Sequence, residues 1–155
     1  MPLYLGSESM QVTMGVTPPA NQIVEALTAG NISYYSNDRI SYLGQYVGAT
    51  DMRTINLPNC ISVEARACYG NYNLSFVSLP KCSYIGSSAF YSCGLRTGYF
   101  PECIYINASA FFSCYSLSYF SASKCSYIGS WTFCKCSTLL SCNFPNYVSI
   151  SGYVF

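Results

Sequence analysis

The segments LPKCSYIGSSAFYSCGL (79–95) and FPECIYINASAFFSCYSL (100–117) repeat one pattern of apolar, cysteine and aromatic residues. Similar segments begin at Leu57 and Ala122, and an incomplete one begins at Phe144. The intervals between the five starts are 22, 21, 22 and 22 residues, and the shorter interval loses its residue near Gly94. One such coil cannot bury its own apolar side chains, so the period predicts a stack of coils with a shared core.

Equivalent positions of the repeats form columns of similar side chains. A branched apolar column contains Val63, Ile85, Ile106, Ile128 and Ile150, and a larger column contains Cys68, Phe90, Phe111, Phe133 and Phe155. Charges alternate at another position, which is occupied by Lys81, Glu102 and Lys124. Coils about 4.8 Å apart would place these opposite charges side by side, which favours an in-register parallel stack.

The two quoted segments resemble the BspA-type leucine-rich repeat, with its succession of LP, IGxxAF, C and L. The resemblance covers residues 54–155 and departs from the pattern at Val63–Cys68 and at Trp131 and Thr132. It implies a repeat solenoid, a β-rich, leucine-rich-repeat-like, right-handed stack of about five coils with short parallel strands. It also implies surface attachment or ligand binding, and no enzyme activity.

Residues 1–53 are predicted to form a small α+β cap that covers the N-terminal end of the core. Two short strand-like stretches and a helix-like stretch over residues 20–29 lie within it. Residues 43–57 resemble a degenerate coil, with Met52 at the position that leucine holds in the later repeats. The opening LYLGSESMQVTMGV is similar to the starts of prophage structural proteins.

The composition argues against several classes of function. Charged residues are 8% of the chain, the net charge is +1, and there is no histidine. A nucleic-acid-binding protein would present a basic face, and histidine is the commonest catalytic base and metal ligand. No acid pair shares a column and no phosphate-binding glycine motif occurs. We therefore predict no catalytic residues, no cofactor and no metal; no apolar run approaches the roughly 18 residues of a membrane span.

The ten cysteines allow three interpretations. They are buried thiols, or disulfides between neighbouring coils, whose spacing lies within the permitted range, or a metal site at the CxC of Cys134 and Cys136. Buried thiols are favoured, because the N-terminus does not resemble a secretory signal and indicates synthesis in a reducing cytoplasm. Use at a cell surface or in a virion is compatible with such synthesis.

Three tyrosines form the first candidate binding surface, named the tyrosine ladder: Tyr84, Tyr105 and Tyr127. Each precedes an isoleucine of the apolar column. Neighbours on an extended segment point to opposite faces, so the rings are predicted to face outward. Protein partners favour tyrosine at interface centres, and sugars lie on such rings. Mutual packing of the rings, which would stabilise the stack by itself, is the alternative.

The strand after each leucine column offers a second surface, on the predicted concave face. Alternation points Val77 and Phe120 inward and their neighbours outward. The candidate binding residues there are Phe76, Tyr99, Tyr119, Ser121, Ser141 and Asn143. We predict a non-catalytic module that binds a protein or glycan surface, as an adhesin or a phage tail component does, with a structural spacer as the alternative. The apolar end of the solenoid is predicted to allow homo-oligomer formation.

Overall fold

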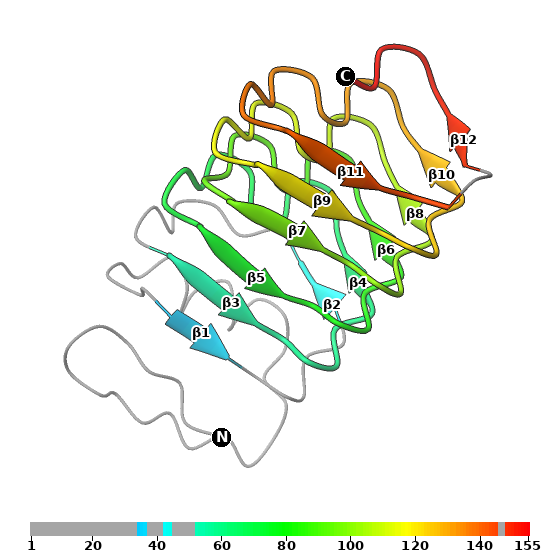
Figure 1. Cartoon of the computed structure of the whole chain (residues 1–155). Coiled ribbons are helices and arrows are strands. Elements are labelled where there is room, and N and C mark those ends of the chain that lie inside the picture. Colours follow the sequence, from blue (N-terminus) through cyan, green and yellow to red (C-terminus); the bar gives the residue numbers. More distant parts are fainter. Residues whose placement is uncertain (1–33, 37–41, 45–51, 146–147) are drawn as a thin grey trace.

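The computed structural model describes residues 34–36, 42–44, 52–145 and 148–155, which form a parallel β-solenoid of about five coils (Figure 1). The strands form two rows along the stack, one of three-residue strands and one of two-residue strands. Within these ranges the chain contains no helix, and so none that could span a membrane. The arrangement confirms the predicted stack of coils with short parallel strands.

The three-residue strands are β1 (Tyr34–Ser36), β3 (Thr54–Asn56), β5 (Phe76–Ser78), β7 (Thr97–Tyr99), β9 (Tyr119–Ser121) and β11 (Ser141–Asn143). The two-residue strands are β2 (Tyr42–Leu43), β4 (Ser62–Val63), β6 (Tyr84–Ile85), β8 (Tyr105–Ile106), β10 (Tyr127–Ile128) and β12 (Ser149–Ile150). The two-residue strands make one sheet, the short-strand face, in the order β12-β10-β8-β6-β4-β2. The others make the long-strand face, which is divided into sheets β1-β3-β5 and β11-β9-β7.

Strand pairing confirms the register of the repeats. Val63 pairs with Ile85, Ile85 with Ile106, and Ile106 with Ile128, always between parallel strands. All four side chains are fully buried. From Val63 to Ile128 the branched apolar column is therefore one continuous line of core side chains, which explains why each coil needs its neighbours to fold. Its fifth member, Ile150, pairs with Ile128 but is 54% exposed.

The column of alternating charges also follows the predicted register. Lys124 Nζ lies 2.7 Å from Glu102 Oε2 in the preceding coil. Lys81 donates to Asn59 Oδ1 at 2.7 Å, again from one coil to the one before it. The ion pair is largely exposed, so it indicates register more than it stabilises the fold.

The centre of the core is a column of stacked phenylalanines, Phe90, Phe111 and Phe133, and the largely exposed Phe155 stacks on its C-terminal end. Neighbouring ring centroids lie 5.3–5.7 Å apart with interplanar angles of 8–18°. Each fully buried ring stabilises the fold by about 1.5–3 kcal/mol relative to an exposed one. Phe120 also enters this core, as predicted, and a Cβ on its strand neighbour Gly98 would lie 2.3 Å from the Phe120 ring.

All ten cysteines are free, and all except Cys134 and Cys142 are buried. The thiols of one column each donate to the carbonyl two residues further on, with Sγ–O distances of 3.2–3.5 Å, and belong to Cys60, Cys82, Cys103 and Cys125. The thiols of a second column donate to the preceding coil at 3.0–3.1 Å, and belong to Cys93, Cys114 and Cys136. Cysteine therefore fills the core as a small apolar side chain and gives buried carbonyls a donor.

Two positions in each turn segment have left-handed backbone. The first, with φ of 56–63°, is occupied by Arg66, Ser88, Ser109, Trp131 and Tyr153, and the second, with φ of 53–74°, by Gly70, Ser92, Ser113 and Lys135. This conformation costs a non-glycine residue about 1–2 kcal/mol. Bonds between coils hold it in place: the Ser88 amide donates to Ala108 at 3.0 Å, and the Ser92 amide donates to Phe112 at 2.8 Å.

The stack extends further toward the N-terminus than the repeats alone indicate. Met52 is fully buried and β2 pairs with β4. The degenerate coil over residues 43–57 stays a prediction, because residues 45–51 lie outside the described part of the chain. β1 lies within the segment assigned to the cap, yet it pairs in parallel with β3, with Tyr34 opposite Thr54. The predicted helix over residues 20–29 and the strand-like stretches before it lie outside the described residues.

Candidate functional site

The tyrosine ladder lies on the short-strand face. Strands β6, β8 and β10 place Tyr84, Tyr105 and Tyr127 opposite one another in register. In each strand the isoleucine is buried and the tyrosine is turned outward, so that Tyr84 is 42% exposed, Tyr105 is 50% exposed and Tyr127 is half-buried. The structure brings the three predicted residues together on one surface.

Two rings of the ladder, those of Tyr105 and Tyr127, are tilted relative to each other. The Tyr105 and Tyr127 centroids are 6.4 Å apart and the ring planes are tilted by 46°. The Tyr127 hydroxyl lies 3.1 Å from the Ser151 hydroxyl, which ties that ring to the next coil. The tilted pair does not cover its rings face to face, and Tyr105 stays 50% exposed to solvent or to a partner.

Buried thiols support the backbone of the ladder. The Sγ atoms of Cys82, Cys103 and Cys125 donate to the carbonyls of Tyr84, Tyr105 and Tyr127, respectively. Burial raises the pKa of Cys82 to about 12, with a further contribution from neighbouring Cys60. Such a thiol stays protonated at neutral pH, so it acts as a donor and not as a nucleophile. In the described part of the chain, no cluster of three or more histidine, cysteine or acidic residues could hold a metal ion.

The column of the tyrosine ladder continues beyond its three members. Tyr42 pairs with Ser62 at the β2 end of the same column, and Ser149 follows Tyr127 at the other end. Ile61 and Ile104 are exposed immediately before Ser62 and Tyr105. Sequence reasoning did not include Tyr42, although its place before the buried Leu43 repeats the tyrosine–isoleucine pattern of the ladder.

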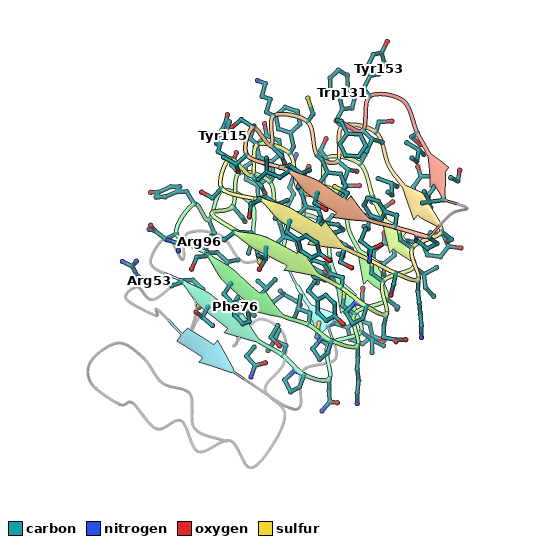
Figure 2. All side chains as sticks on the ribbon, in the orientation of Figure 1. Arg53, Phe76, Arg96, Tyr115, Trp131 and Tyr153 are labelled. Carbon is teal, nitrogen blue, oxygen red and sulfur yellow. The ribbon has the colours of Figure 1, made fainter. Side chains whose placement is uncertain are left out.

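The long-strand face presents most of the second predicted set outward. Phe76, Tyr99 and Tyr119 are exposed, as are Ser141 and Asn143. Figure 2 shows Phe76 on this face. The set does not form one ladder, however, because Phe76 belongs to β5 and the others to the separate β11-β9-β7 sheet.

Ser121 is a correction to the predicted surface. Alternation gives it an outward position on β9, but it is only 4% exposed. Its register neighbours on β7 and β11 are the larger Tyr99 and Asn143, and Asn143 Nδ2 donates to its hydroxyl at 3.3 Å. A small side chain between two larger ones cannot contact a partner, so Ser121 is part of the framework of this face.

Sequence reasoning missed a second aromatic column, which we call the turn ladder: Tyr69, Tyr91 and Phe112. Its rings stack closely, with centroids 4.6 and 4.9 Å apart and interplanar angles of 12° and 8°. Arg66 Cζ lies 5.8 Å from the Tyr69 centroid and Lys135 Nζ lies 5.4 Å from the Phe112 centroid. The repeat alignment contains this column immediately after the core phenylalanines, so a signal for it was present.

The comparison with known protein families agrees with this geometry. Residues 40–155 match the BspA type leucine rich repeat region family, in six copies. The match begins before the first complete repeat, two residues before β2. No curated protein and no solved structure gives a significant match. Because the family match covers residues 40–155 and the coil geometry agrees with it, this chain belongs to the BspA-type leucine-rich-repeat family.

Proposed function

We propose that this chain is a non-catalytic adhesion module that recognises a protein surface through the tyrosine ladder. The BspA-type repeat family suggests a repeat-based module for protein binding or adhesion. One observation carries the choice of surface. Tyr84 and Tyr105 are exposed in register on a sheet whose inner side is the core of the solenoid.

The chemistry of the ladder suits a protein partner. Tyrosine offers a large contact area, loses few rotamers on binding, and carries a hydroxyl that donates or accepts a hydrogen bond. Exposed Ile61 and Ile104 add apolar area beside the rings. Because short strands on a packed core hold these side chains, little conformational entropy is lost when a partner binds.

The groups around the ladder support binding and not catalysis. Three charged residues each stand three positions before a tyrosine of the ladder: Glu102 and Lys124 pair with each other, and Lys81 donates to Asn59. The thiols behind the ladder donate to backbone carbonyls. None of these groups is placed to act as a base on a bound molecule.

The test is binding of the labelled full chain to intact bacterial cells, to epithelial cells and to mucin. A variant with Tyr84→Ser, Tyr105→Ser and Tyr127→Ser should bind at least about tenfold more weakly, because interface-centre tyrosines carry much of the affinity. A matched control carries Phe76→Ser, Tyr99→Ser and Tyr119→Ser on the long-strand face. Circular dichroism and melting temperature establish that both variants are folded.

The outcomes separate the proposal from its alternatives. Loss of binding only in the long-strand variant would move the site to that face. Binding that survives protease treatment of the cells but not glycosidase treatment would contradict a protein partner. Absence of binding to every surface would favour the structural spacer.

A further inference from the structure

One coil is a residue shorter than its neighbours, and a cavity of about 530 Å³ lies beside it. We call this cavity the turn notch. Its principal lining residues are Tyr69, Tyr72, Tyr91, Ser92, Tyr115 and Ser116. Small-molecule sites have volumes of about 300–1,000 Å³, so the turn notch is large enough for one small ligand. It lies on the turn segments, away from the tyrosine ladder, and does not depend on the proposed function.

Gly94 explains why the turn notch is open. It occupies the column of Tyr72 in the preceding coil and Tyr115 in the following coil. A Cβ on Gly94 would lie 2.1 Å from the Tyr72 carbonyl oxygen, so backbone fills the place where a side chain would begin. The two tyrosines are therefore two coils apart, about 9.6 Å along the stack, with no side chain of the column between them.

The tyrosines of the turn notch have two different roles. Tyr69 and Tyr91 stack on each other at 4.6 Å, and Tyr91 also stacks on Phe112, so their faces are already in contact with protein. Tyr72 is 65% exposed and Tyr115 is 57% exposed. Figure 2 shows Tyr115 projecting from the edge of the stack. The stacked pair therefore forms a fixed wall, and Tyr72 and Tyr115 are the rings that a ligand can reach.

The lining of the turn notch selects for a neutral ligand. None of the lining side chains is charged. A charged ligand would lose hydration there without gaining a counter-charge. The hydroxyls of Ser92 and Ser116 lie among the aromatic side chains and can donate or accept hydrogen bonds.

We propose that the turn notch binds a neutral pyranose sugar between Tyr72 and Tyr115. A pyranose combines an apolar C–H face, which packs on an aromatic ring, with a rim of hydroxyls that can bond to serine. It is also thicker than a planar aromatic molecule, which suits a gap of two coil spacings.

Saturation-transfer NMR on the full chain tests the proposal with the methyl glycosides of glucose, galactose and N-acetylglucosamine as probes. Glucuronate is the charged control and p-cresol is the planar aromatic control. At least one neutral glycoside should bind, with a dissociation constant on the order of 1 mM. Tyr72→Ser or Tyr115→Ser should weaken that binding at least about tenfold (about 1.4 kcal/mol), whereas Tyr99→Ser, on the long-strand face, should not change it.

A second variant tests the site without removing either ring. Ser116→Trp adds a bulky side chain to the turn notch at an exposed position and should abolish glycoside binding. The proposal is overturned if no neutral glycoside binds, or if binding persists in Ser116→Trp. It is also overturned if p-cresol or glucuronate binds as tightly as the best glycoside. The tyrosine-ladder variant should still bind the glycoside even when it no longer binds cells. The two proposals can therefore fail independently of each other.

Discussion

The tyrosine ladder and the turn ladder are built from the same kind of residue, repeated once per coil, but their rings are arranged differently. In the turn ladder, Tyr69, Tyr91 and Phe112 stack nearly parallel at 4.6–4.9 Å. In the tyrosine ladder, Tyr105 and Tyr127 are 6.4 Å apart and tilted by 46°. The faces of stacked rings are covered by the neighbouring rings, whereas tilted rings leave part of their faces exposed to solvent. Repetition of an aromatic residue therefore does not by itself indicate a binding surface.

The backbone behind each ladder accounts for part of this difference. Tyr84 and Tyr105 lie on strands, which position ring after ring on a twisting sheet. Tyr91 lies in a turn segment and is followed by Ser92, whose left-handed φ is repeated in the neighbouring coils. Both ladders have thiols beneath them: Cys82 donates to the Tyr84 carbonyl, and Cys114 donates to the carbonyl of Phe90, just before Tyr91.

The largest effect should come from breaking the core that both ladders share. Ile106→Asp places an unpaired charge at a fully buried position between two coils. We expect a loss of several kcal/mol, about 3–5, and a melting temperature lowered in proportion. Ile104→Asp is the matched control, because Ile104 is exposed two residues earlier and should tolerate the charge. Equal melting temperatures for the two variants would contradict the register.

Alkaline pH should loosen the thiol columns behind both ladders. Burial raises the pKa of Cys82 from its usual 9.0 to about 12, so the unfolded chain loses this proton before the folded chain does. The stabilisation is complete below pH 9 and is lost as pH rises toward 12. Denaturant unfolding from pH 8 to pH 11 should show a falling free energy of unfolding. The fall should be shallower in Cys82→Ala than in the wild type, and parallel curves would show that Cys82 does not contribute.

Stability and binding should respond in opposite ways to changes in the two ladders. Tyr91→Ala removes two stacked contacts and should lower the free energy of unfolding by about 1–3 kcal/mol, from about 0.5–1.5 per aromatic pair. Tyr105→Ala removes one loose contact and should cost less, about 0.5–1 kcal/mol. Cell binding should fall for Tyr105→Ala and persist for folded Tyr91→Ala. The reverse result would make the turn ladder the recognition surface.

The repeat period predicted most of the fold, because columns in a stack of coils can be read directly from an alignment. The buried isoleucine column, the inward Phe120, the Lys124–Glu102 pair and the exposed Tyr84 and Tyr105 all follow from that alignment and from strand alternation. β1 escaped prediction because Tyr34–Ser36 carries none of the repeated cysteine or isoleucine positions.

The candidate sites were harder to predict because they depend on neighbours in space. Alternation gives Ser121 an outward position but does not show that Tyr99 and Asn143 lie on either side of it. The shorter repeat at Gly94 is plain in the sequence, yet the cavity appears only when Tyr72 and Tyr115 are placed in the coils before and after that of Gly94. The left-handed backbone at Ser92 is also invisible in sequence, since serine has no preference for it.

The smallest effect should come from the charges that flank the tyrosine ladder. Glu102→Gln removes the exposed pair with Lys124 and should cost less than about 1 kcal/mol, measured by denaturant unfolding at low salt. At high salt the difference from wild type should vanish, because salt screens the pair. Lys81→Met is the matched control: Lys81 bonds to the neutral Asn59 amide, so its effect should depend much less on salt. If salt changes the free energy of unfolding of both variants equally, the charged column affects stability through the net charge of the chain. The Lys124–Glu102 contact would then contribute nothing specific to the register, which the buried isoleucine column alone would set.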